Sequence, residues 1–150
     1  MLIPIDADTV TNGIRLAVAP VFLLTAVSGM IGVVAGRLAR IIDRARLVED
    51  RAESTADDKV LRRARDELRR LRVRGRLANG AIALLTLCAL LIGMTIMLLF
   101  VGETTELQLS RWAVGSFLAG IVGFLLALLC FLAETFMATR ILNFRLPPSI

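Results

Sequence analysis

Glu134 is the single acidic residue of the last apolar segment of the chain, and it stands near the end of that segment. An ionisable group at the bilayer centre costs about 2.5 to 3.5 kcal/mol on insertion scales, so an acid near the boundary usually has a partner. Arg37, Arg40 and Arg76 are expected at the same depth. We therefore predict an ion pair between Glu134 and an arginine of this group. A proton relay, the alternative, needs a second buried acid, and the apolar segments contain none.

The sequence RLARIIDRAR directly follows the first apolar segment and gathers charge at one membrane boundary. Its charged residues closest to the boundary are Arg37, Arg40, Asp43 and Arg44. In one interpretation, Arg37 and Arg40 are anchors that reach the headgroups and set the orientation of the chain. In a symmetric oligomer the four residues would instead form an inner collar, and charged rings are how pores select ions. Both interpretations stay open.

Small residues form a row on one face of the first apolar segment. Thr25, Gly29, Gly32 and Gly36 follow one another at intervals of four, three and four, and Ser28 lies beside them. These intervals place the row on one helix face, where another backbone can come close. The row indicates either tight helix packing or, if several copies surround an axis, the lining of a pore.

Arginines form a stripe in the stretch that leads into the second apolar segment: Arg62, Arg65, Arg69, Arg72 and Arg76. We interpret most of this stripe as a solvated or lipid-facing surface that pairs partly with acids of the preceding stretch. Arg69, Arg72 and Arg76 are the candidates for contact with anionic membrane lipid, which we expect as a partner. No aromatic residues are interleaved to stack on bases, so nucleic acid is not expected as a partner.

Enzymatic chemistry has little support in this composition. Histidine is absent, and the serines and threonines lack a base, so no nucleophile with its base is recognisable. We expect no enzyme, no metal site and no cofactor. Cys88 and Cys130 lie at different depths of two apolar segments, too far apart for a disulfide, and we interpret them as small apolar side chains.

Three apolar segments must position all of these residues. Of the 150 residues 57% are hydrophobic, and the mean hydropathy is +0.75, whereas roughly 45 to 50% apolar residues is ordinary for a soluble domain. We predict an all-α membrane protein with transmembrane helices over residues 16–36, 77–101 and 112–139, each long enough to cross the hydrocarbon core.

The distribution of charge predicts the orientation of these helices. Fourteen of the 18 Lys and Arg residues lie between Arg37 and Arg76, and basic loops beside membrane segments stay in the cytoplasm. Residues 1–15 and the loop 102–111, whose single basic residue is Arg111, are then external. The tail 140–150 is cytoplasmic.

Residues 37–76 are predicted to form a cytoplasmic antiparallel coiled-coil hairpin that extends the first two membrane helices. Apolar residues recur at helical spacing in the first arm and at the three-four-three spacing of a coiled-coil seam in the second. They are Leu38, Ile41, Ile42, Ala45 and Val48, and then Leu61, Ala64, Leu68 and Leu71. Ser54 and Thr55, each three residues before an aspartate, resemble a helix start and place the turn near residues 53–56.

Three stretches give the chain a resemblance to a known family. They are APVFLLTAVSGMIGVVAGRLARIIDRAR, LRRLRVRGRLANGAI and FLAETF. On these stretches the chain resembles a bacterial family of small membrane proteins catalogued as domain of unknown function 2721. The resemblance implies three helices and a place in the bacterial inner (plasma) membrane. It also marks Pro20, Arg37, Asp43, Arg44 and Glu134 as matching the family pattern.

Two functions are compatible with these observations. The first is a homo-oligomeric ion-conducting pore lined by residues 16–36, held in register by the hairpin. Acids outside and arginines inside give conflicting signals for ion selectivity, which stays open. The second is a membrane scaffold or regulatory subunit that docks a protein or anionic lipid through the hairpin.

Overall fold

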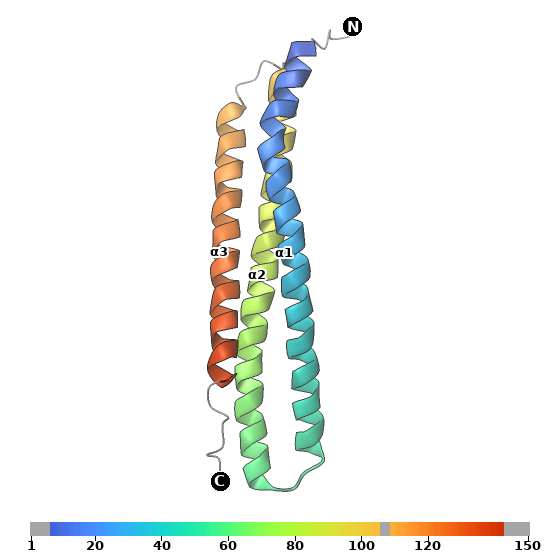
Figure 1. Ribbon diagram of the computed structural model, residues 1–150, viewed down its shortest axis with the longest axis vertical. Helices are drawn as coiled ribbons and strands as arrows, with labels where there is room; N and C mark the ends of the chain where they lie inside the picture. The colour runs from blue at the N-terminus through green and yellow to red at the C-terminus, as the bar shows by residue number, and fades with distance from the viewer. Residues whose placement is uncertain (1–6, 106–108, 143–150) are drawn as a thin grey trace. The chain divides into compact units, whose positions relative to one another are not determined.

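The structure is a computed structural model that describes residues 7–105 and 109–142, and three helices account for nearly all of these residues. Helix α1 spans Ala7–Glu53, α2 spans Asp58–Thr105 and α3 spans Ser110–Leu142, in the order that Figure 1 traces along the chain. Each helix is long and apolar enough to cross a membrane. The predicted all-α class and three apolar helices are confirmed, and the chain is a membrane protein.

Parts of the predicted polar segments lie outside the described residues. These parts are residues 1–6 of the N-terminal segment, residues 106–108 of the external loop and residues 143–150 of the tail.

Helices α1 and α2 each join an apolar segment and a charged segment without a break. Helix α1 has 47 residues and continues through Pro20, while α2 has 48. Proline removes one backbone donor from a helix interior, but membrane helices tolerate this loss where neighbours satisfy the freed carbonyl. The charged stretches are therefore helical, as the spacing of their apolar residues predicts.

A short turn of residues 54–57 separates α1 from α2. At the end of α1, the Ser54 amide donates to the Asp50 carbonyl at 3.2 Å, and the Ser54 hydroxyl donates to the Arg51 carbonyl at 3.1 Å. At the start of α2, the Asp57 carboxylate accepts from the Lys59 amide at 2.9 Å. Asp57 is thus the capping residue of α2, in place of the predicted Ser54 or Thr55, because the Ser54 side chain is used to close α1.

The described residues fall into two compact units, and the helices run through both. One unit contains Gly32–Ala83 and the residues from Ala127 onward. Ala81 on α2 is buried, and the other buried positions of this unit repeat every seven residues on each helix. They are Val34, Ile41 and Val48 on α1, Ala64, Leu71 and Ala78 on α2, and Ala127 and Glu134 on α3. In this series Glu134 occupies a core position that would otherwise be apolar.

The other unit contains residues up to Ile31 together with Leu84–Leu126. Here α2 and α3 approach closely at Gly120, where an added Cβ would lie 3.5 Å from Ile92 Cγ1 and 3.7 Å from the Cys88 carbonyl. The Thr95 and Ser116 hydroxyls lie 2.8 Å apart and link the same two helices. Gly120 and Ser116 of α3 therefore serve packing within the chain.

Candidate functional site

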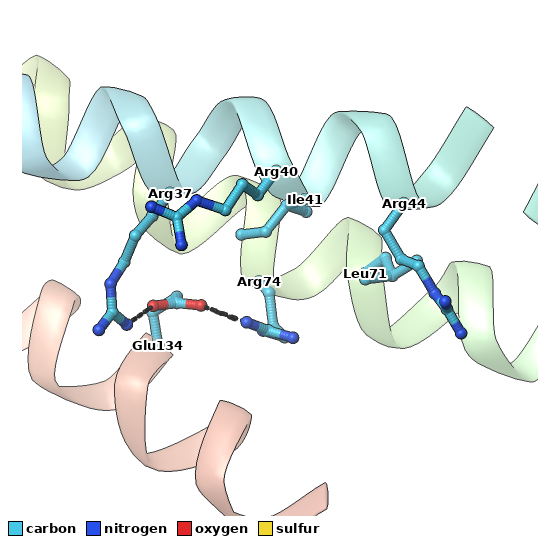
Figure 2. A pocket seen from close by; sticks show the side chains of 7 residues that line it. All are labelled: Arg37, Arg40, Ile41, Arg44, Leu71, Arg74 and Glu134. Carbon is cyan, nitrogen blue, oxygen red and sulfur yellow. Dashed lines mark hydrogen bonds and ion pairs between the residues drawn. The ribbon is translucent and has the colours of Figure 1, made fainter. Parts of the chain in front are cut away.

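One carboxylate joins all three helices within the unit that contains Glu134. Glu134 on α3 is only 1% exposed. Its Oε2 accepts from Nη1 of Arg37 on α1 at 3.1 Å, and its Oε1 accepts from Nη2 of Arg74 on α2 at 2.7 Å. The Arg74 Nε also donates to Oε1 at 3.1 Å. Figure 2 shows the two guanidinium groups reaching the carboxylate from opposite sides. We call these three residues the carboxylate clamp.

Arg37 is held on α3 by more than its ion pair. Its Nη1 also donates to the Thr135 hydroxyl at 2.9 Å, and its guanidinium lies 4.9 Å from the centre of the Phe131 ring. Such a cation–π contact contributes about 0.5 to 2 kcal/mol, depending on desolvation. The side chain of Arg37 stays 39% exposed. Its direction is therefore fixed by α3, although one edge of the side chain reaches solvent or headgroups.

Arg74 is the clamp residue that the sequence does not predict, because the predicted partners beside Arg37 are Arg40 and Arg76. The structure pairs Glu134 with Arg37 and Arg74. Arg76 is exposed, and Arg40 forms no ion pair with Glu134. The reason is helical direction, because Arg74 lies three residues after buried Leu71 and four before buried Ala78. Arg76 projects from another face of α2. The spacing to Leu71 and Ala78 is the sequence signal that could have identified Arg74.

The clamp compensates the buried negative charge of Glu134, which would destabilise the fold if it had no partner. A buried carboxylate needs both opposite charge and hydrogen-bond donors, and here two arginines supply them. Two guanidinium groups against one carboxylate leave one excess positive charge in the clamp. Removing the carboxylate would therefore leave the charges of Arg37 and Arg74 partly buried without a partner. Breaking a buried ion pair in this way is strongly destabilising.

A second ion pair joins α1 and α2 at the surface of the same unit. Arg44 donates through Nη2 and Nε to Glu67 Oε1 at 2.8 and 3.0 Å. Both side chains are well exposed, at 48% and 39%. Exposed pairs contribute only about 0 to 1 kcal/mol. This pair therefore serves as a natural reference for the buried clamp.

The four predicted collar residues divide into two groups. Arg37 turns to Glu134 and Arg44 turns to Glu67, so both charges have partners within the chain. Arg40 and Asp43 are exposed on α1. A collar built from all four residues would require Arg37 and Arg44 to leave their partners Glu134 and Glu67.

The row of small residues on α1 lies on the surface of the described structure. Thr25, Ser28, Gly29, Gly32 and Gly36 are all exposed. A Cβ added to any of the three glycines would meet nothing within 4 Å. The Thr25 hydroxyl donates to the Val21 carbonyl of its own helix at 3.2 Å. Packing against the chain's own helices therefore does not explain this row, in contrast to Gly120 on α3.

The arginine stripe of α2 is also exposed along its whole length, from Arg62 to Arg76, and so are the lipid-contact candidates Arg69 and Arg72. Beside the clamp, a cavity of about 220 Å³ is lined by seven residues of α1, α2 and α3, all in one unit: Arg37, Arg40, Ile41, Arg44, Leu71, Arg74 and Glu134. Figure 2 shows these side chains. Among the described residues, no group of three or more His, Cys, Asp or Glu side chains could hold a metal ion.

Comparison with known proteins identifies the family. The family described as Protein of unknown function (DUF2721) matches residues 17–144, which include every residue of the clamp and the row of small residues. The chain belongs to the DUF2721 family. The resemblance noted from the sequence is thus confirmed. Neither a curated protein nor a solved structure matches this DUF2721 chain.

Proposed function

We propose that this protein assembles as a homo-oligomer in the bacterial inner membrane, with α1 at the interface between copies, and that the assembly encloses an ion-conducting pore lined by α1. One observation carries the proposal: Gly29, Gly32 and Gly36 open onto empty space within one copy. Glycine in a helix interior costs about 1 kcal/mol relative to alanine in water. Three such residues on one face call for a contact that only small residues allow.

Helix α1 has two opposite faces with different roles in this proposal. Val27 and Val34 are fully buried within the chain. Gly32 follows Val27 by five residues and Gly36 follows Val34 by two, which places the glycines about 140° and 200° around the helix from the buried face. One face thus holds the chain together, and the other is free for a partner.

A second copy of the chain is the occupant that this face fits best. Small residues spaced by three and four let two helix backbones approach closely in a membrane, where close packing drives association. An identical helix supplies an identical small face, and symmetric repetition then closes the assembly around an axis. The seven-residue repeat of buried positions supports a coiled-coil hairpin that would hold the copies in register.

The chemistry along the proposed axis is modest. Thr25 and Ser28 provide the hydroxyl groups, and the exposed Asp43 provides a negative charge at the inner end. Arg37 is engaged by Glu134 and is not part of this lining. The orientation follows the sequence prediction, with the N-terminus outside and the hairpin and C-terminus in the cytoplasm.

Crosslinking between copies tests the interface. In a chain with Cys88 and Cys130 replaced by alanine, Gly32→Cys is expected to form a disulfide-linked dimer in membranes on mild oxidation, because the Cα atoms of copies at the axis come within disulfide reach. Electrophoresis without reductant measures the product. Gly93→Cys on α2 is the matched control, since Gly93 is also exposed with nothing within 4 Å. Equal and weak crosslinking of both variants would contradict the interface.

A second candidate function is a scaffold or regulatory subunit that docks anionic lipid or a protein through the hairpin. The exposed arginine stripe favours this function, because juxtamembrane Lys and Arg each gain about 1 kcal/mol near an anionic surface. Ion flux separates the two candidates. A scaffold conducts nothing in liposomes, even when it is a stable oligomer.

A further inference from the structure

The cavity beside the clamp gathers more positive charge than the chain itself neutralises. Four arginines and one glutamate are among its lining residues, which leaves a formal charge of +3. Glu67 pairs with Arg44 from outside the lining and offsets one further charge. Like charges at close range repel strongly where water is partly excluded. The cavity is therefore electrostatically prepared for an anion.

Arg40 is the lining residue whose charge is least engaged. Arg37 and Arg74 donate to Glu134, and Arg44 donates to Glu67. Among the described residues, Arg40 takes part in none of these ion pairs. Figure 2 shows its guanidinium group on the α1 side of the Glu134 carboxylate, with the Arg37 and Arg74 groups nearby. A ligand held here would meet Arg40 first and the outer edges of the two clamp arginines next.

The size of the cavity limits the ligand. Pockets for drug-sized molecules and cofactors measure about 300 to 1,000 Å³, whereas this one measures about 220 Å³. It has room for a small oxyanion group, and a larger molecule fits only such a group inside it. Guanidinium forks match phosphate oxygens in pairs, which makes arginine clusters typical phosphate sites.

We infer that this cavity binds a phosphate group, with Arg40 as its principal ligand and the clamp arginines as supporting donors. The phosphate can belong to a lipid headgroup or be free in solution. Arg37 directly follows the apolar part of α1, so the predicted topology puts the cavity at headgroup depth in the inner leaflet, where phosphates are abundant. The Glu134 carboxylate already accepts from Arg37 and Arg74, so the clamp has no place for a second carboxylate. The donors of Arg40 stay free for a ligand. The site lies within one copy and does not depend on the proposed oligomer.

Binding measurements on the full chain test this site. Phosphatidic acid, phosphatidylcholine and inorganic phosphate are each titrated onto purified protein in detergent, and the thermal unfolding midpoint reports binding. We expect phosphatidic acid to raise the midpoint and Arg40→Gln to weaken its apparent affinity by about tenfold, because one charge-assisted contact is lost. Arg46→Gln is the matched control: it removes the same charge from an exposed position on α1 outside the cavity and outside the arginine stripe of α2. It should change the affinity by less than about twofold.

Each outcome bears on the inference. A rise with inorganic phosphate that competes with the lipid assigns the site to free phosphate, and a rise with lipid alone assigns it to a headgroup; both support a phosphate site. Equal losses in Arg40→Gln and Arg46→Gln would overturn it in favour of diffuse surface attraction, as would the absence of any rise in the wild type. Arg40→Lys keeps the charge without the fork and should fall between wild type and Arg40→Gln, which keeps the test valid if the glutamine variant is unstable.

Discussion

Replacing Glu134 by glutamine is expected to lower the free energy of unfolding by about 3 kcal/mol. The substitution keeps the shape of the side chain but leaves Arg37 and Arg74 facing a neutral amide. Breaking a buried pair on one side costs about 3 to 5 kcal/mol. The lower end applies because these arginines keep 39% and 20% of their side-chain surface exposed. Thermal unfolding in detergent measures the effect, and the midpoint should fall by about 6 to 12 °C.

Glu67→Gln is the matched control for this prediction. It makes the same chemical change at the exposed pair between Arg44 and Glu67, where a loss of at most about 1 kcal/mol is expected. A Glu134→Gln protein as stable as wild type would show that the clamp does not hold the helices. Equal losses in the two variants would mean that burial of Glu134 has no special effect.

Replacing Gly32 by leucine is expected to reduce ion flux into liposomes by about tenfold or more. Gly32 is exposed and an added Cβ meets nothing within the chain, so the fold of one copy has room for the larger side chain. At a symmetry axis every copy would add one leucine, and an apolar constriction excludes water and ions. Flux of an ion-sensitive dye in proteoliposomes measures the change, and chromatography in detergent checks the assembly.

Gly93→Leu on α2 controls for the effect of adding an apolar side chain to an exposed glycine. Its flux should match that of wild type. Similar flux in wild type and Gly32→Leu would remove α1 from the conduction path. No flux from wild-type protein under any ionic gradient would rule out the pore and leave the scaffold as the remaining function.

The helices could be predicted from the sequence because their signals are local. Long uncharged runs and recurring Leu, Ile and Ala at helical spacing predict α1, α2 and α3 without any contact between them. The same spacing predicts helical arms up to a turn near residue 54. The capping residue was not predicted, because Ser54, Thr55 and Asp57 all have suitable side chains and backbone geometry decides among them.

The clamp could be predicted only in part. A lone acid in an apolar helix implies a basic partner, and Arg37 lies at a suitable depth. The choice between Arg74 and Arg76 depends on which face of α2 turns to α3, and depth along the helix axis says nothing about direction around it. The row at Gly29, Gly32 and Gly36 shows the same limit: spacing predicts a shared face, and only the fold reveals that this face is turned outward.

The mass of the wild-type assembly in lipid nanodiscs tests the central claim most directly. One copy has a mass of 16.3 kDa, and the proposed pore requires that several copies associate. Native mass spectrometry is predicted to give one discrete multiple of 16.3 kDa. A single copy of 16.3 kDa under conditions that preserve membrane complexes would contradict the account, because one three-helix chain can neither cover the glycine face of α1 nor enclose a pore.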